Sequence, residues 1–132
     1  MIHTFEIKTA KSTELIDITS SVQELLNKHG PLDGVCYVYV PHTTAGVTIN
    51  ENADPSVQND ILMVLGKIIR TDEPYRHAEG NSPAHIKATL TGSSAAILVD
   101  SGRLVLGTWQ GIYFCEYDGP RRRRVHVKFL KG

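Results

Sequence analysis

VCYVYVPHTTAGVTIN (residues 35–50) decides the fold, because it contains two strand-forming runs separated by a proline. Residues 35–40 are β-branched and aromatic side chains, a composition typical of a buried strand. Pro41 ends the run, since it has no amide hydrogen to donate to a sheet. Residues 45–50 form the next expected strand. The stretch therefore predicts part of a sheet, with the polar residues around His42 lying in the turn beside it.

Further strands and helices are expected on both sides of this stretch. The additional strands are expected at residues 3–9, 15–17, 95–99, 104–106, 111–116 and 123–130. The first helix is expected to run to about residue 28, with Thr19 or Ser20 as its N-cap. The second is expected to begin at Pro55, with Asp54 as its N-cap, and a short third helix at Ser82. Because tight turns join the terminal strands, we expect an α+β fold with a mostly antiparallel sheet in one domain, residues 1–132.

The composition excludes several classes of protein. The 132 residues carry 14 basic and 14 acidic side chains, so the whole surface has no strong field to attract nucleic acid or membranes. No apolar stretch approaches the roughly 20 residues of a membrane helix, and the N-terminus lacks the apolar segment of a secretion signal. The two cysteines, Cys36 and Cys115, lie in apolar runs and are expected to be buried free thiols. We therefore expect a cytoplasmic protein.

The second helix has more apolar residues than one buried face requires. Leu62, Met63 and Ile69 widen a stripe that already repeats at helical spacing. Such a helix is expected either to be sandwiched between other elements or to lie partly in a contact between subunits.

Three of the six histidines stand in polar surroundings. His42 opens a segment rich in threonine, asparagine and carboxylates, and His77 and His85 flank a loop-to-helix junction, HAEGNSPAH. Three imidazoles suit zinc, copper, iron or nickel, and they leave one coordination position open for water or substrate. The alternative is that these histidines cap or hydrogen-bond, because their spacing matches no compact ligand motif.

Carboxylates near these histidines are candidates for proton transfer. Glu51 and Asp54 follow His42 closely in sequence and are the candidate general acid or base. Asp54 is equally explained as a helix cap. Glu79 is a further candidate, or a solvated loop residue.

Two further motifs could take part in binding a ligand. GTWQG (107–111) contains the only tryptophan: Trp109 could stack on a ring or fill core volume, and Gln110 could orient a polar group or satisfy buried backbone. In the arginine run 121–124, alternate side chains face opposite sides of a strand, and Arg121 is best placed to hold a phosphate. The alternatives are a charge-protected edge strand or salt bridges between subunits. RNA binding ranks lowest, because the run has no interleaved aromatic residues.

Together these segments resemble a known family. PHTTAGVTINENADP (41–55), YRHAEGNSPAHIKA (75–88) and GTWQGIYFCEYDGPRRRR (107–124) resemble the YjbQ-like family of small uncharacterised proteins. The resemblance implies compact α+β subunits assembled as homotrimers, with a divalent metal, commonly zinc, bound by the residues matching His42, His77 and His85. It also implies a secondary thiamine-phosphate synthase activity.

The implied reaction, a transferase reaction, assigns roles to the remaining residues. The metal would neutralise the diphosphate leaving group, Arg121 would clamp phosphate oxygens, Thr43, Thr44 and Asn81 would donate hydrogen bonds, and Trp109 would stack on a heteroaromatic ring. Against this, diphosphates usually prefer Mg²⁺ held by carboxylates, whereas imidazoles favour softer metals. Two alternatives therefore stay open. One is a metal-dependent hydrolase of a small phosphorylated substrate with Glu51 as base, and the other is a non-enzymatic metal- or ligand-binding trimer.

Overall fold

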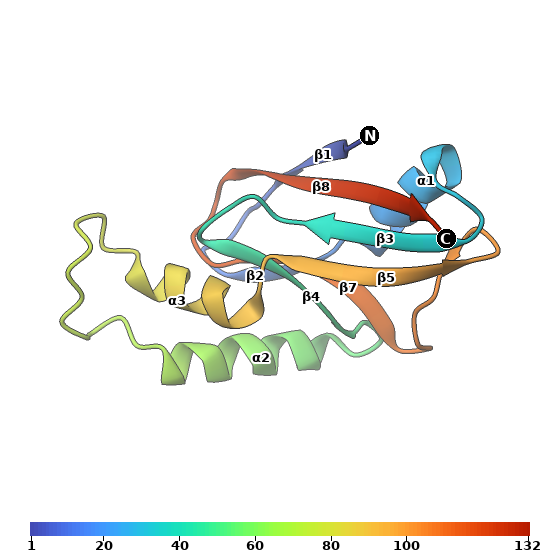
Figure 1. Ribbon diagram of the computed structural model, residues 1–132. Coiled ribbons are helices and arrows are strands. Elements are labelled where there is room, and N and C mark those ends of the chain that lie inside the picture. Colours follow the sequence, from blue (N-terminus) through green and yellow to red (C-terminus); the bar gives the residue numbers. More distant parts are fainter.

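The computed structural model describes residues 1–132, arranged as two antiparallel sheets and three helices (Figure 1). The larger sheet has five strands in the order β1 (His3–Lys8), β8 (Arg122–Lys131), β3 (Gly34–Tyr39), β5 (Ser94–Asp100) and β6 (Arg103–Leu104). The smaller sheet has three, in the order β2 (Glu14–Asp17), β7 (Gln110–Glu116) and β4 (Ala45–Glu51). Every strand pair is antiparallel.

The main core lies between the two sheets. It contains alternate residues of the central strands, including Val38, Val47, Phe114 and Val127, which are almost inaccessible to solvent. Helix α1 (Thr19–His29) adds Val22 and Leu26 to the same core. Burial of this apolar surface is the main force that holds the sheets face to face.

Two helices cover the other face of the smaller sheet. Helix α3 (Ser82–Thr91) packs Ala84 and Ala88 against Tyr113 and Cys115 of β7, and leucines of α2 (Pro55–Ile68) join this second cluster. Strand β7 is consequently buried on both faces, which explains its almost continuous apolar sequence. Burial raises the pKa of both free thiols, Cys36 and Cys115, to about 12, so that neither is a thiolate at neutral pH.

The structure confirms the α+β class and the antiparallel pairing, and it corrects three details. Asp54 caps α2 as expected, accepting a hydrogen bond from Ser56 N at 2.9 Å. The cap of α1, however, is Ile18, and the Thr19 hydroxyl instead accepts the amide of Ile112 at 2.8 Å. This bond links α1 to β7, so tertiary structure overrides the capping preference. The strand expected at 104–106 is only Arg103–Leu104, and the strands form two sheets.

The surface of α2 differs from that of an ordinary amphipathic helix. None of its residues is buried, and Met63, Val64 and Ile68 are 48%, 48% and 66% exposed. The helix is therefore not sandwiched within this chain. None of the three helices has the length and apolarity needed to cross a membrane.

Candidate functional site

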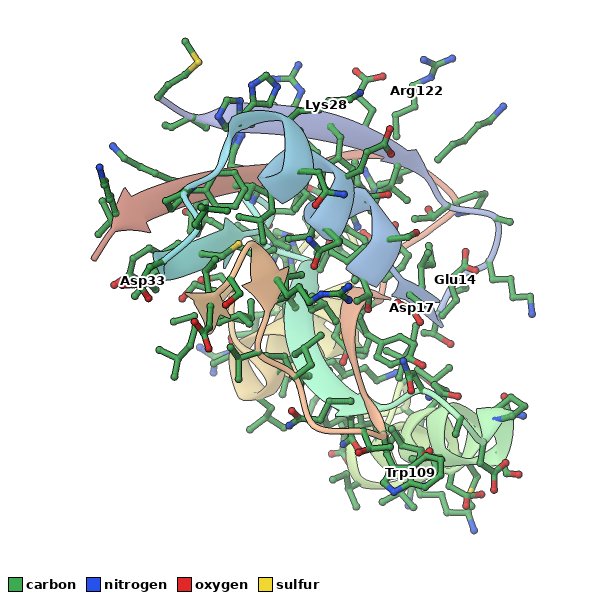
Figure 2. The ribbon with its side chains drawn as sticks, turned by 90° about the vertical axis from the view of Figure 1, so that its right-hand side faces the viewer. Glu14, Asp17, Lys28, Asp33, Trp109 and Arg122 are labelled. Carbon is green, nitrogen blue, oxygen red and sulfur yellow. The ribbon has the colours of Figure 1, made fainter.

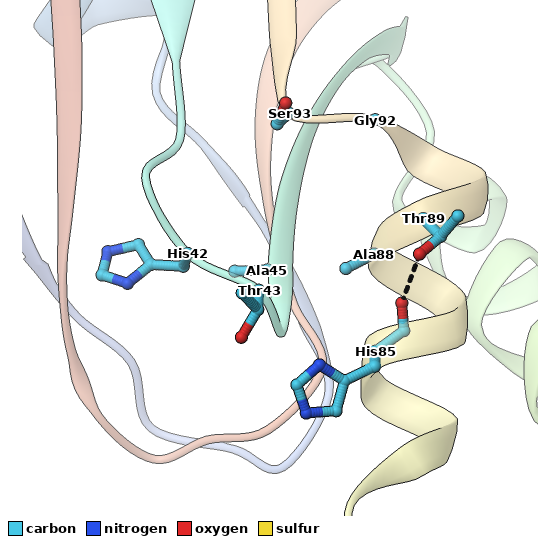
Figure 3. A pocket seen from close by; sticks show the side chains of 8 residues that line it. All are labelled: His42, Thr43, Ala45, His85, Ala88, Thr89, Gly92 and Ser93. Atoms are coloured by element: carbon cyan, nitrogen blue, oxygen red, sulfur yellow. Dashed lines mark hydrogen bonds between the residues drawn. The ribbon is translucent and has the colours of Figure 1, made fainter.

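A polar cavity of about 300 Å³ opens where the β3–β4 loop, the start of α3 and the β7–β8 turn meet. Its lining residues come from all three expected motifs: Pro41, His42, Thr43, Thr44, Glu79, Asn81, His85, Asp118, Arg121 and Arg123. None of them has an apolar side chain other than Pro41. The cavity adjoins a second hollow of about 380 Å³, which shares His42, Thr43 and His85 (Figure 3). We define these two hollows as the polar site.

Two glycines set the position of α3 beside the polar site. The amide of Val47 in β4 donates to the carbonyl of Gly92, the residue after α3, at 3.1 Å. A Cβ atom on Gly46 would lie only 2.5 Å from that carbonyl oxygen. Gly92 itself has φ +96°, a conformation that favours glycine. The close approach of the end of α3 to strand β4 therefore places His85 next to the β3–β4 loop.

Below the polar site lies a buried ion pair. Arg123 of β8 and Glu116 of β7 have side chains 5% and 0% exposed, and Arg123 Nε donates to Glu116 Oε1 at 2.8 Å. Arg123 also donates to the Thr44 hydroxyl at 2.9 Å. Burial raises the pKa of Glu116, but hydrogen bonds from Arg123, the Asp118 amide and Thr9 outweigh it and hold that pKa below its usual value. Both groups are thus charged and neutralise each other.

The second cationic side chain of the polar site is also paired. Arg121 donates through Nη2 to Asp118 Oδ2 at 2.8 Å and through Nε to the Asp118 carbonyl at 2.7 Å. The Asn81 amide donates to the same carboxylate oxygen at 2.9 Å. With Arg123 bound to Glu116, neither guanidinium is a free cation. A dianionic ligand in this site would therefore need another positive charge.

The structure brings together two of the three histidines expected to bind metal. His77, in the loop before α3, and His85, in its first turn, meet edge to face with ring centroids 5.2 Å apart. Glu79 Oε1 lies 3.8 Å from His77 Nε2.

His42 lines the polar site, but its ring is turned away from His85 (Figure 3). Its Nε2 accepts a hydrogen bond from the backbone amide of Arg124 at 2.9 Å. No group of three His, Cys, Asp or Glu side chains is arranged to hold a metal ion. The rings of His77 and His85 thus lie together, although His77 lines neither hollow, and the His42 ring is held by Arg124.

The structure places four other expected residues outside the polar site. Glu51 is the last residue of β4 and Asp54 lies just beyond it, whereas His42 precedes the first residue of the strand. At about 3.3 Å per residue, β4 separates them by roughly 20 Å. Glu51 accepts the amide of Ala53, and Asp54 caps α2. Trp109 is 63% exposed and so does not fill core volume, and Gln110 accepts the amide of Gly107. Figure 2 shows Trp109 at the α2 end of the molecule.

Sequence reasoning missed the buried acid of the site. Glu116 stands in the apolar run IYFCEYD, and a charged residue inside such a run is itself a sign of a buried ion pair. The role of Thr9 could not be read from the sequence either, because its partner Glu116 lies 107 residues away, and Asp118 binds both the nearby Arg121 and the distant Asn81. The arginine alternation was predicted correctly: Arg123 is buried, whereas Arg122 and Arg124 face solvent.

Comparison with known proteins agrees with these motifs. Residues 3–132 match the family described as "UPF0047 protein YjbQ-like". The chain belongs to this family. A UPF0047 protein of Bacillus subtilis, YugU, is 50% identical to this YjbQ-like chain over 131 residues, covering 98% of it and 99% of YugU. A UPF0047 protein of Methanocaldococcus jannaschii is 50% identical over 130 residues, covering 98% and 94% of the two chains.

Solved structures show the same YjbQ-like fold. An uncharacterised conserved protein of the YjbQ/UPF0047 family from Clostridium acetobutylicum superimposes with a TM-score of 0.95 at 52% identity, covering 97% of this chain and 99% of its own. A hypothetical protein from Aeropyrum pernix gives 0.94 at 40% identity, covering 100% and 99%. The names of these relatives assign no activity to the YjbQ-like chain.

Proposed function

We propose that this protein binds a small phosphorylated molecule in the polar site together with a divalent metal held by His77 and His85. Zinc is the metal that we propose. The observation that carries the proposal is the edge-to-face pair of these two rings beside a cavity lined with hydrogen-bond donors. Two imidazoles are suitable ligands for zinc, and the open coordination positions would be available to the ligand.

The charges of the site support a metal and an anion bound together. Arg121 and Arg123 are already neutralised by Asp118 and Glu116, so a phosphate dianion alone would enter a site with no net positive charge. A bound divalent cation would supply that charge and would act as a Lewis acid on a phosphate oxygen. Thr43, Thr44 and Arg121 would orient the remaining phosphate oxygens by hydrogen bonds.

The reaction that the family resemblance implies, formation of thiamine phosphate from a pyrimidine-methyl diphosphate and a thiazole phosphate, is the first activity to assay. Hydrolysis is the second candidate, favoured by the position of Glu79. This carboxylate lines the cavity and lies 3.8 Å from His77, whereas Glu51 lies at the far end of β4. Glu79 rather than Glu51 would then be the base.

Elemental analysis of the purified protein tests the proposal. Wild type is compared with His77→Ala, His85→Ala and the control His29→Ala, which changes an exposed histidine that stacks on His3. We expect zinc in wild type and in the control, and loss of zinc from the other two variants. Zinc retained in both His77→Ala and His85→Ala would overturn the proposed site.

Activity assays then separate the candidate functions. Thiamine phosphate and pyrophosphate formed from the two precursors would identify a transferase, and phosphate released from one substrate alone would identify a hydrolase. Metal binding with neither product would identify a non-enzymatic binding protein. Each product should be lost in His85→Ala.

We also propose that the chain assembles as a homotrimer in solution. Two uncovered surfaces support an assembly. One is the apolar side of α2, with Met63 and Ile68, and the other is the open face of the five-stranded sheet, where Tyr39 and Leu98 are 48% and 64% exposed. Apolar patches of this kind on a small protein are typical of contacts between chains.

A further inference from the structure

The position of His42 is determined by a gap in the five-stranded sheet. Strands β3 and β8 pair up to Tyr39 opposite His126, and continuing this register would place Pro41 opposite Arg124. The pairing with β8 ends at Tyr39, because the amide of Val40 faces the β5 side, where it donates to Ser93, and Pro41 follows. The imidazole of His42 takes the vacated place and accepts the Arg124 amide through Nε2 at 2.9 Å. The ring therefore completes the hydrogen bonding of β8.

This bond fixes which nitrogen of His42 carries the proton. A backbone amide is only a donor, so Nε2 must offer its lone pair, and in the neutral ring the proton then resides on Nδ1. Burial, together with the nearby Arg123 cation, lowers the pKa of His42 and favours this neutral form. Rotating Nε2 toward a metal would leave the Arg124 amide without its partner, at a cost in stability.

The geometry points to His42 as a hydrogen-bond donor to the anionic ligand, through Nδ1–H, and not as a ligand of the metal. This inference rests on the proposed function, because it assigns a role within the same polar site. His42 lines both hollows of the site, and Figure 3 shows its ring separated from His85, with one nitrogen toward β8. Metal and phosphate would thus be bound by different histidines: His77 and His85 hold the cation, and His42 contacts the anion.

Two substitutions separate the donor role from a ligand role. In His42→Gln the amide oxygen can accept the Arg124 amide while its NH₂ group remains a donor, whereas His42→Leu removes both functions. Zinc content should be unchanged in both variants and lost in His77→Gln. Affinity for inorganic phosphate in the presence of zinc, measured by titration calorimetry, should stay within about threefold of wild type in His42→Gln. It should fall about tenfold or more in His42→Leu, the effect of one hydrogen bond to a charged group.

Nitrogen NMR of ¹⁵N-histidine protein gives a readout that needs no ligand. We expect His42 as the Nδ1–H tautomer with Nε2 hydrogen-bonded, and we expect added zinc to shift the ring nitrogens of His77 and His85 but not those of His42. Zinc loss from His42→Gln equal to that from His77→Gln, or an Nε2–H tautomer, would overturn the inference. If zinc shifts no histidine at all, the proposed function fails, and the tautomer still decides how His42 is held.

Discussion

Arg123 Nε donates a hydrogen bond to Glu116 Oε1 at 2.8 Å inside the protein, where neither side chain is more than 5% exposed. The Thr9 hydroxyl donates to the same oxygen at 2.8 Å, and Arg123 Nη2, which also donates to Glu116 Oε2, donates to the Thr44 hydroxyl at 2.9 Å. One buried pair thus connects β8, β7 and the loop that begins the polar site. Removing one member of such a buried, hydrogen-bonded pair costs much stability, whereas replacing both members with apolar residues costs little.

Breaking this pair from one side should destabilise the fold strongly. In Arg123→Met the Glu116 carboxylate would stay buried without its cation, so we expect a loss of about 3–5 kcal/mol in the free energy of unfolding, measured by urea denaturation. The double variant Arg123→Met with Glu116→Leu should recover most of that loss, because it leaves no unpaired charge. A double variant with the summed loss of both single variants would contradict this account.

Glycine at position 46 should be required by the approach of α3 to β4. A Cβ atom there would lie 2.5 Å from the Gly92 carbonyl oxygen, so Gly46→Ala must push the helix end away. We expect a loss of stability of about 1–3 kcal/mol and weaker zinc binding, because His85 moves with α3. The matched control is Gly66→Ala in α2, where a Cβ would contact nothing within 4 Å, and which should gain up to about 1 kcal/mol. Equal effects of the two substitutions on calorimetric unfolding would refute the prediction.

Acid should weaken the contact between α1 and β1. His3 and His29 stack with ring centroids 4.2 Å apart, and burial, with the nearby His29 charge, lowers the pKa of His3 below its usual 6.5. The unfolded chain then binds the proton more readily than the folded one, so this contribution to stability is complete above pH 6.5 and is lost as the pH falls through that value. The difference between urea midpoints at pH 7.5 and 5.5 should shrink in His29→Gln but not in the neighbouring control Asn27→Gln.

Charges on the exposed side of α2 should disrupt the proposed homotrimer. Met63→Lys with Ile68→Lys places two cations in a surface that we propose to be buried between subunits, where unpaired charges are costly. Sedimentation velocity should show a trimer for wild type and smaller species for this variant. The control variant Ser20→Lys with Asn27→Lys, which places two cations at exposed positions of α1, should remain trimeric. A monomeric wild type would refute the assembly, and a trimeric double variant would exclude α2 from the interface.

The secondary-structure elements and the fold class could be inferred from the sequence alone. Strands such as residues 35–40 are recognisable because buried strands are rich in β-branched and aromatic residues, and Asp54 with Pro55 marks a helix start by local chemistry. The three motifs also identified the correct loops, and His42, His85 and Arg121 do line one cavity. These features depend on neighbours in the chain, so they can be inferred from sequence.

Which side chains meet, and through which atoms, depends instead on how distant segments pack together. Trp109 and Glu51 lie close to the motif residues in sequence, yet the length of β7 and β4 carries them to the opposite end of the molecule. His42 is separated from His85 because its Nε2 accepts a hydrogen bond from the backbone amide of Arg124, which is 82 residues away in sequence. Glu116 becomes a partner of Arg123 only where two strands converge on one buried point. Hydrogen-bond partners of this kind are set by the packing of distant segments, which local sequence preferences do not encode.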